Sequence, residues 1–328
     1  MNNPLLVGDA TRAPARVALV TCRDLPELEE DDRLLLAPLA ERGVTAEPVI
    51  WDDTAADWAA YDLIVLRSPW DYFYRYGEFL TWIGRLPAGR VLNPADVVRW
   101  NTDKRYLREL ADAGVPVVPT QWIGADDTFT PPAGEYVVKP AVSAGSKDTG
   151  RYGPADADLA QAHVQRLQQA GRLVMVQPYL PAVDTFGETA LLHFASPVDG
   201  RLAYSHAIRK GPMLAGPDTA TDSLYVPEAI TPRVPTEAEF ELARQVLAAV
   251  QVPGSLLPGR LSAEPPGVRS AEPPEVQSGL LYARVDLIPG PDGSPVLVEL
   301  ELTEPSVFLA YADGAAERFA DAIVARLR

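Results

Sequence analysis

The sequence predicts an α/β protein that continues into lobes of mixed α+β character, and three observations predict it. The first 94 residues alternate buried strand runs with helical runs, which is typical of a parallel sheet. After Asn101, short strands, helices and hairpins follow one another without that alternation. The length of 328 residues and the hydrophobic content of 47% allow two or three lobes with cores of their own.

The N-terminal part predicts a loose tail at residues 1–15 and an α/β domain at residues 16–94. The expected strands are Arg16–Thr21, Ala46–Trp51, Asp62–Arg67 and Arg90–Leu92, and the expected helices are Glu29–Arg42, which Gly43 ends, and Arg75–Arg85. The turn after the first strand, residues 21–24, contains no glycine. A dinucleotide fingerprint needs glycine there for the backbone to approach a pyrophosphate, so nicotinamide binding by this half is excluded.

Residues 95–176 predict a central lobe. A helix is expected over Thr102–Ala113, with Asn101 or Thr102 as its N-cap and Gly114 after its end. The other expected elements are strands at Val117–Trp122 and Glu135–Lys139, a Gly/Ser loop at Ser143–Gly150, a helix from about Ala155 to Ala170, and a strand at Leu173–Gln177.

Residues 177–328 predict a C-terminal lobe. Thr236 and Glu239 form a capping box at the start of a helix that runs to Val250. The Pro-rich stretch 253–279 repeats the sequence SAEPP and lacks apolar periodicity, which predicts a disordered surface insertion. The other expected elements are a hairpin of Thr185–Ala195 and Arg201–Arg209, strands Leu280–Ile288 and Pro295–Leu302, and a helix near Ala315–Leu327.

The composition excludes several classes of function. Lys and Arg number 29 and Asp and Glu number 45, so the net charge of −16 argues against binding the phosphate backbone of nucleic acids. No apolar run approaches eighteen residues, which argues against a membrane span. Cys22 is the one cysteine, so no internal disulfide can form, as is typical of the cytoplasm. We expect Cys22 to be a core residue, and the three histidines show no metal-ligand spacing.

The last two predicted strands carry an acidic set. Because side chains alternate between faces along a strand, Arg284 and Asp286 share one face, and Glu299 and Glu301 share another. An antiparallel register with residue 286 opposite 299 also places 284 opposite 301. Carboxylates gathered in this way repel one another unless a cation lies between them, and oxygen-only clusters suit Mg²⁺ or Mn²⁺. The alternative is a solvated strand face with Glu–Arg pairs.

Two lysines have the surroundings of phosphate ligands. Lys104 lies in the first turn of its predicted helix, and Lys139 ends an apolar strand just before the Gly/Ser loop. The loop offers backbone N–H groups and hydroxyls but does not match the P-loop pattern. Either lysine, taken singly, is better explained as a surface residue.

The strand that ends in Gln177, Pro178 and Leu180 has a third set of binding features. An apolar strand that leads into a short connector presents backbone groups suited to a planar base, and Asp184 is placed to hold a ribose. An ordinary strand and turn is the alternative.

The order of these motifs resembles the ATP-grasp superfamily, in particular its glutathione-synthetase-like members. The motifs are Asn101–Lys104, Val137–Pro140 with its Gly/Ser loop, Gln177–Leu180 with Asp184, Arg284–Asp286 and Glu299–Glu301. The resemblance covers about Asn93 to Arg328, and the preceding unit resembles the family's Rossmann-like N-terminal domain. It implies the ATP-grasp fold, ATP as the nucleotide and Mg²⁺ (or Mn²⁺) as the metal.

The resemblance also implies a role for each matching residue. Lys104 and Lys139 would contact the phosphates, and the loop with Ser143, Gly145 and Ser146 would close over them. Gln177, Pro178 and Leu180 would line the adenine, and Asp184 would bind the ribose. Asp286, Glu299 and Glu301 would hold the metal, and Arg284 and Arg209 would stabilise the transferring phosphoryl group. The chain departs from many relatives in having Glu301 rather than Asn, and residues 187–190, shortly after the ribose carboxylate, contain no arginine.

The sequence of residues 209–213 and 299–306 looks most similar to a small branch of the ATP-grasp superfamily. This branch includes the cyclo-ligase of D-cycloserine biosynthesis, which closes O-ureido-D-serine into a ring. The implied function is an ADP-forming carboxylate–amine ligase that acts through an acyl phosphate on an amino-acid-like small molecule. A small-molecule kinase and a non-catalytic nucleotide-binding protein are the alternatives. A homo-oligomer is compatible with the sequence.

The acceptor substrate is expected between the N-terminal unit and the metal-binding strands. Arg67, Ser68, Trp70 and Asp71 lie just past a strand end, where α/β sheets bind ligands, and Arg67 is expected to pair with a substrate carboxylate. A structural aromatic turn is the alternative. Glu304 and Ser306 are further candidates for substrate contact, as are Arg23 and Asp24.

Overall fold

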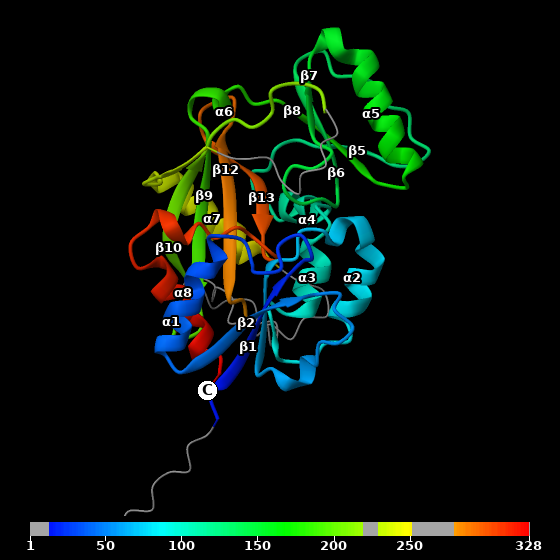
Figure 1. Cartoon of the computed structure of the whole chain (residues 1–328). Coiled ribbons are helices and arrows are strands. Elements are labelled where there is room, and N and C mark those ends of the chain that lie inside the picture. The colour runs from blue at the N-terminus through cyan, green and yellow to red at the C-terminus, as the bar shows by residue number, and fades with distance from the viewer. Residues whose placement is uncertain (1–12, 219–228, 251–278, 328) are drawn as a thin grey trace, which may run out of the picture.

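The structure is a computed structural model that describes residues 13–218, 229–250 and 279–327. Three β-sheets account for the strands of this part of the chain. In Figure 1 the blue N-terminal strands lie low in the view, the lobe that carries α5 lies at the upper right, and the long green and orange strands run between them. The predicted α/β class with α+β lobes is confirmed.

The N-terminal sheet is parallel, as the alternation of strands and helices predicts. Its strands have the order β2-β1-β3-β4, and their bounds are Ala15–Thr21 (β1), Val44–Ile50 (β2), Leu63–Ser68 (β3) and Val91–Leu92 (β4). The helices are α1 (Leu36–Glu41) and α2 (Tyr76–Ile83). The expected helix over 29–42 is wrong in its first part, where a 3₁₀ turn at Asp32–Leu35 precedes α1. Pro38 lacks an N–H and fits the first turn of a helix, which agrees with this later start.

A second sheet is antiparallel and carries the phosphate-binding candidates. Its order is β5-β8-β6-β7, with bounds Gln121–Ile123 (β5), Tyr136–Pro140 (β6), Gly150–Tyr152 (β7) and Val174–Pro178 (β8). Helix α5 (Ala157–Gln169) buries Ala160, Val164 and Leu167 in a core shared with these strands. The expected strand over 117–122 is wrong at its start, because Val117 forms a single bridge with Leu297 and β5 begins at Gln121.

The third sheet has five antiparallel strands in the order β11-β10-β9-β12-β13. Their bounds are Glu188–Ala195 (β9), Leu202–Lys210 (β10), Ile230–Pro232 (β11), Tyr282–Pro289 (β12) and Pro295–Glu301 (β13). Residues with even numbers in β9, such as Leu192, join a core with α8 (Ala315–Ala325) and the N-terminal sheet. Leu191 on the opposite face joins a core with α7 (Glu237–Ala249). The two faces of the sheet therefore support two different cores.

Two local predictions at the ends of helices have opposite outcomes. The capping box of α7 is confirmed, because the Thr236 hydroxyl accepts from the Glu239 N–H while Glu239 accepts from the Thr236 N–H. The helix expected over 102–113 is instead α3 (Ala95–Asn101) followed by α4 (Tyr106–Asp112). Asn101 is not a cap, because its amide is bonded to the carbonyl of Leu300 and the N–H of Leu302.

The strand expected from Thr185 begins later, at Glu188. Residues 182–185 form a short helix, α6 (Ala182–Thr185), and Gly187 follows it with a φ of 78°. A left-handed residue of this kind ends a helix, and glycine adopts it without steric cost.

The predicted tail and insertion lie almost wholly outside the described residues. Of the expected tail 1–15, Ala15 belongs to β1 and residues 1–12 are not described. Of the expected insertion 253–279, only Gly279 is described. Within the ranges that the structure describes, no helix has the length and apolar character needed to cross a membrane.

Candidate active site

A cavity of about 680 Å³ collects most of the residues that the sequence singles out. Its walls come from the second and third sheets, from loops and turns of the N-terminal unit, and from the segment after β13. Candidates on the walls are Trp70, Lys104, Lys139, Ser143, Gly145, Ser146, Gln177, Pro178, Leu180, Arg284, Glu299, Glu301, Glu304 and Ser306. Segments separated by more than 200 residues thus meet around one volume.

The predicted register of β12 and β13 is confirmed. Asp286 lies opposite Glu299 and Arg284 lies opposite Glu301. A register shift follows Asp286, so the regular alternation ends there. Glu299 and Glu301 line the cavity, whereas Asp286 is 1% exposed and lies behind the wall.

Asp286 lies between two cations. Arg284 Nε donates to its Oδ1 at 2.9 Å, and Lys210 Nζ donates to its Oδ2 at 2.8 Å. Burial alone would raise the pKa of Asp286, but Arg284 and Lys210 outweigh it and hold the pKa to about 2. Asp286 is therefore ionised across the physiological pH range.

Glu299 and Glu301 differ in their electrostatic surroundings. Lys104 Nζ lies 3.0 Å from Glu299 Oε1, and despite burial Lys104 and Lys139 lower the pKa of Glu299. Glu301 is paired with Arg284, yet burial together with the charges of Glu299 and Asp286 raises its pKa to about 8. The raised pKa of Glu301 reflects the excess of negative charge that Glu299 and Asp286 bring to the site. A divalent cation bound there would offset that charge.

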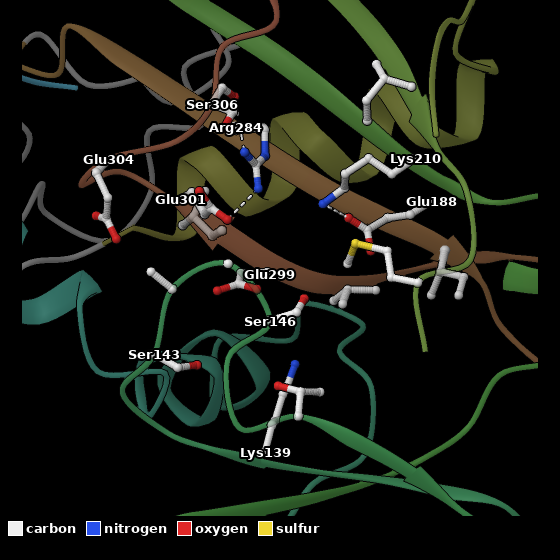
Figure 2. A pocket seen from close by; sticks show the side chains of 18 of the residues that line it. Lys139, Ser143, Ser146, Glu188, Lys210, Arg284, Glu299, Glu301, Glu304 and Ser306 are labelled. Atoms are coloured by element: carbon white, nitrogen blue, oxygen red, sulfur yellow. Dashed lines mark hydrogen bonds and ion pairs between the residues drawn. The ribbon is translucent and has the colours of Figure 1, made fainter. Parts of the chain in front are cut away.

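The donor chemistry of these three carboxylates fits Mg²⁺ or Mn²⁺, because all of the donors are oxygen. The expectation that they converge on one point is not met in the described part of the chain, where no three Asp, Glu, His or Cys side chains form a group that could hold an ion. The reason is that Arg284 and Lys210 occupy the space around Asp286. Figure 2 shows Arg284 directed at Glu301, with Glu299 across the cavity from Lys139.

The two predicted lysines lie on the cavity wall with different partners. Lys104 Nζ bonds to Glu299 and donates to the Ser143 carbonyl at 3.0 Å, so it ties the Gly/Ser loop to β13. Lys139 has no ion pair within 4.0 Å among the described residues, and burial lowers its pKa. Asp148, whose φ is 53°, pairs with Arg166 and Arg172 and so anchors the far end of the loop to α5 and the residues after it.

The residues expected around adenine and ribose are only partly on the wall. Gln177, Pro178 and Leu180 line the cavity, and Gln177 Nε2 donates to the Thr120 hydroxyl at 2.9 Å. Asp184 is not on the wall. It accepts from the Tyr179 hydroxyl at 2.5 Å and from Arg151 Nη1 at 3.5 Å.

The expectation for Arg209 is wrong, and its neighbour occupies the expected place. Arg209 donates to the carbonyls of Phe186 and Thr185 and does not line the cavity. Lys210 lines the cavity and pairs with Asp286 and Glu188. Successive residues of a strand point to opposite faces, so a shift of one residue reverses the assignment.

The expected substrate contacts of Arg67, Ser68 and Asp71 are also wrong. Arg67 is fully buried, with Nε 2.9 Å from Asp32 and Nη2 donating to the Pro305 carbonyl at 2.6 Å. The Ser68 hydroxyl is buried against that of Thr21, at 3.2 Å. Asp71 accepts from Trp51 Nε1 and Arg75. The structural aromatic turn, which was the alternative, describes these three residues.

Tyr72, Glu188 and Lys210 are polar wall residues to which the sequence assigned no role. Tyr72 follows the expected motif by one residue. Glu188 and Lys210 are register partners in the β9–β10 hairpin, so alternation along that hairpin carried the signal that could have found them.

Comparison with known proteins gives matches over nearly the whole chain. Residues 17–93 match a family model described as the N-terminal domain of the D-cycloserine synthetase DcsG. The cycloserine biosynthesis protein DcsG of Streptomyces lavendulae is 38% identical over 323 residues, which span 95% of this chain and 99% of that protein.

Solved structures show the same similarity. A crystal structure of D-cycloserine synthetase DcsG matches with a TM-score of 0.77 and 35% identity, covering 96% of this chain and 100% of that one. A RimK-domain ATP-grasp protein from Sphaerobacter thermophilus matches with a TM-score of 0.55 and 19% identity over 94% of this chain and 100% of that one, which shows a shared fold.

Proposed function

The chain belongs to the ATP-grasp ligase family of the cycloserine biosynthesis protein DcsG, and from this premise we propose that it closes an amino-acid-like substrate into a ring, as in D-cycloserine biosynthesis. It is an ATP-dependent ligase that joins a carboxylate to an amine. The observation that carries the proposal is a single cavity that holds lysines from the nucleotide side, Arg284 from β12 and carboxylates from β13.

The chemical task explains why such a cavity is needed. A free carboxylate is a poor acyl donor, because its leaving group would be oxide or hydroxide. Transfer of the γ-phosphoryl group of ATP to the carboxylate gives an acyl phosphate with a good leaving group, which an amine then displaces. The protein contributes positioning and charge neutralisation.

We assign the nucleotide contacts to the residues on the wall. Lys104 and Lys139 would neutralise the phosphates, and the loop with Ser143, Gly145 and Ser146 would cover them. Gln177, Pro178 and Leu180 would line the base. The absence of an ion pair at Lys139 among the described residues supports its assignment, because a phosphate would supply the missing charge.

Asp286, Glu299 and Glu301 would hold Mg²⁺, which supplies charge neutralisation between the phosphoryl oxygens. Arg284 donates to two of these carboxylates, Asp286 and Glu301. With these carboxylates engaged in holding the metal, the Arg284 guanidinium would be available to stabilise the transferring phosphoryl group. Lys210, rather than Arg209, is the second cation on this side of the cavity.

Two alternatives are not favoured. A small-molecule kinase would stop at a stable phosphorylated product, and a non-catalytic nucleotide-binding protein would not need the acidic set. The full-length similarity to a cycloserine synthetase supports the ligase instead.

We further propose that the enzyme works in the cytoplasm on a small molecule. Light scattering on the purified chain measures whether it assembles as a homo-oligomer.

The proposal is tested with O-ureido-D-serine, ATP and Mg²⁺. We expect ADP and inorganic phosphate in equal amounts and a cyclic product smaller than the acid supplied. Glu299→Gln, which keeps the shape of the side chain and removes its charge, is expected to abolish turnover. AMP with pyrophosphate, ADP without free phosphate, or a product larger than the acid would contradict the proposal.

A further inference from the structure

The 303–310 segment, which follows β13, forms part of the cavity wall beside the N-terminal unit. Residues 303–308 have no regular secondary structure, yet each carbonyl from 303 to 307 accepts a side-chain hydrogen bond. The donors are Tyr282 Oη to Thr303, Trp70 Nε1 to Glu304, Arg67 Nη2 to Pro305, Arg284 Nη1 to Ser306 and His206 Nε2 to Val307, at 2.6 to 3.1 Å.

The end of the segment is held in the same way. The two carboxylate oxygens of Asp31 accept from the N–H groups of Leu309 and Ala310, both at 2.8 Å. The path of the segment is therefore fixed through its backbone by side chains from the N-terminal unit, β10 and β12. Such fixation is expected where side chains must be held in position for a ligand before it binds.

Glu304 is the carboxylate that this segment presents to the cavity, as Figure 2 shows. The hydroxyl of the buried Tyr72 interacts with this carboxylate and favours its charged form. The carboxylates that the third sheet contributes to the site, Glu188, Asp286, Glu299 and Glu301, each have a lysine or arginine partner. No such ion pair reaches Glu304 from any residue in the described ranges.

The lack of an ion pair at Glu304 among the described residues points to a ligand, because the environment of Glu304 is unfavourable for an unpaired anion. Burial raises its pKa to about 7, and the interaction with Tyr72 and the charges of Lys104 and Arg284, which are not paired with it within 4.0 Å, only partly offset this effect. The backbone of the 303–310 segment is already held by other residues, so its conformation does not depend on this side chain. A carboxylate kept on a cavity wall in this way lacks only a cationic ligand.

We propose that Glu304, supported by Tyr72, binds the protonated amino group of the substrate and makes the enzyme selective for acids that carry a free amine. The inference rests on the proposed ligase function and extends it to the class of substrate. An ammonium group offers three N–H donors to a carboxylate. An α-amino acid places its carboxyl one carbon from that ammonium, and Arg284 lies beside the same segment through its bond to the Ser306 carbonyl.

The test compares two acids as substrates for ADP release: O-ureido-D-serine and its des-amino analogue, 3-(ureidooxy)propanoic acid. We expect the unmodified enzyme to prefer the amine-bearing acid in kcat/KM. Glu304→Gln is expected to reduce that preference by about 10- to 100-fold, because a charge-assisted hydrogen bond is lost. The change should come mainly from the KM for the amine-bearing acid, with little effect on the analogue.

Two further variants separate this role from others. Tyr72→Phe removes the hydroxyl that interacts with Glu304 and is expected to reduce the preference less, which also tests the inference if Glu304→Gln does not fold. Glu41→Gln changes an exposed carboxylate outside the cavity and should leave both acids unaffected. Titration with a non-hydrolysable ATP analogue checks that each variant keeps its nucleotide site.

Several results would overturn the inference while the ligase function stands. One is an unmodified enzyme that uses both acids equally well. Another is a Glu304→Gln enzyme that keeps the full preference, or one in which kcat falls equally for both acids, as loss of a general base would produce. If the unmodified enzyme released ADP with neither acid, the proposed function itself would fail.

Discussion

At the residue scale, Lys139 has the clearest sign of a missing partner on the nucleotide side. It is the last residue but one of β6 and lies on the cavity wall, and its pKa is lowered because burial disfavours its charge. Glu299 opposes that effect from across the cavity but is itself bonded to Lys104. A lysine in such a position destabilises the empty protein slightly and becomes favourable when an anion binds beside it.

Replacing Lys139 with methionine therefore has opposite effects on stability and on catalysis. We expect the ligand-free Lys139→Met protein to be as stable as the unmodified protein or more so, because a buried unpaired charge has gone. The kcat/KM for ATP is expected to fall by about 100-fold, as for loss of one electrostatic donor to a transferring group. Thermal unfolding without nucleotide and steady-state kinetics measure the two effects.

Lys147→Met is the matched control, since Lys147 lies in the same Gly/Ser loop but not on the cavity wall. It should change neither quantity appreciably. A Lys139→Met enzyme with normal ATP kinetics would remove Lys139 from the nucleotide site.

Arg67 shows what the sequence could not reveal at this scale. A strand-end arginine before an aromatic motif is as well suited to a substrate carboxylate as to a structural one. The deciding facts are its ion pair with Asp32, 35 residues earlier, and its bond to the Pro305 carbonyl, 238 residues later. Neither partner is marked by local spacing in the sequence. Arg67 was therefore recognised as a special residue, but the predicted contact with substrate was wrong.

At the element scale, the turn between α6 and β9 controls the position of Lys210. Gly187 has a φ of 78°, and a Cβ added to it would lie 2.6 Å from the Lys210 carbonyl oxygen and 2.7 Å from Arg209 Nε. The carbonyl belongs to a paired strand and cannot move without moving Lys210. Any side chain at position 187 is therefore expected to disturb both the hairpin and the cavity.

We expect Gly187→Ala to reduce the free energy of unfolding by about 2 kcal/mol or more, through backbone strain and this clash. Turnover should fall as well, because Lys210 and its bond to Asp286 would shift. Gly43→Ala is the control, because Gly43 has a similar φ of 75° but no atom within 4 Å of the added Cβ. Urea denaturation of both variants separates strain from clash, and equal losses would show that the clash is unimportant.

Elements with strong local patterns were predictable from the sequence. The parallel first sheet, the capped helix α7, and the shared faces of Arg284 with Asp286 and of Glu299 with Glu301 follow from periodicity and alternation. The division of the 102–113 helix was not predictable, because the amide of Asn101 bonds to β13, about 200 residues away. The cavity contacts of Glu188 and Lys210 depend on the hairpin register for the same reason.

At the scale of the whole molecule, the five-stranded sheet holds two buried histidines that link stability to pH. His193 and His206 are each 5% exposed, and burial lowers the pKa of each from 6.5 to about 4. As the pH falls, the unfolded chain binds protons before the folded one does. Stability is therefore fully present above pH 6.5 and is lost as the pH falls from 6.5 towards 4.

We expect each histidine to account for about 2 kcal/mol of lost stability between pH 7 and pH 5, given about 1.4 kcal/mol per pKa unit. Urea midpoints at the two pH values measure the change. His206→Gln keeps a hydrogen-bonding side chain at the site and should make the decrease shallower. An unchanged pH dependence in that variant would show that His206 is not one of the groups responsible.

The whole account depends on the facing strands β12 and β13 as the place where the metal and the polyphosphate of ATP are bound. The most direct test is a crystal structure of the protein with a non-hydrolysable ATP analogue and Mn²⁺, with anomalous data collected. We expect Mn²⁺ peaks between the phosphates and at least two of Asp286, Glu299 and Glu301, with Lys139 against the phosphates. Metal and phosphates bound away from these carboxylates would contradict the account.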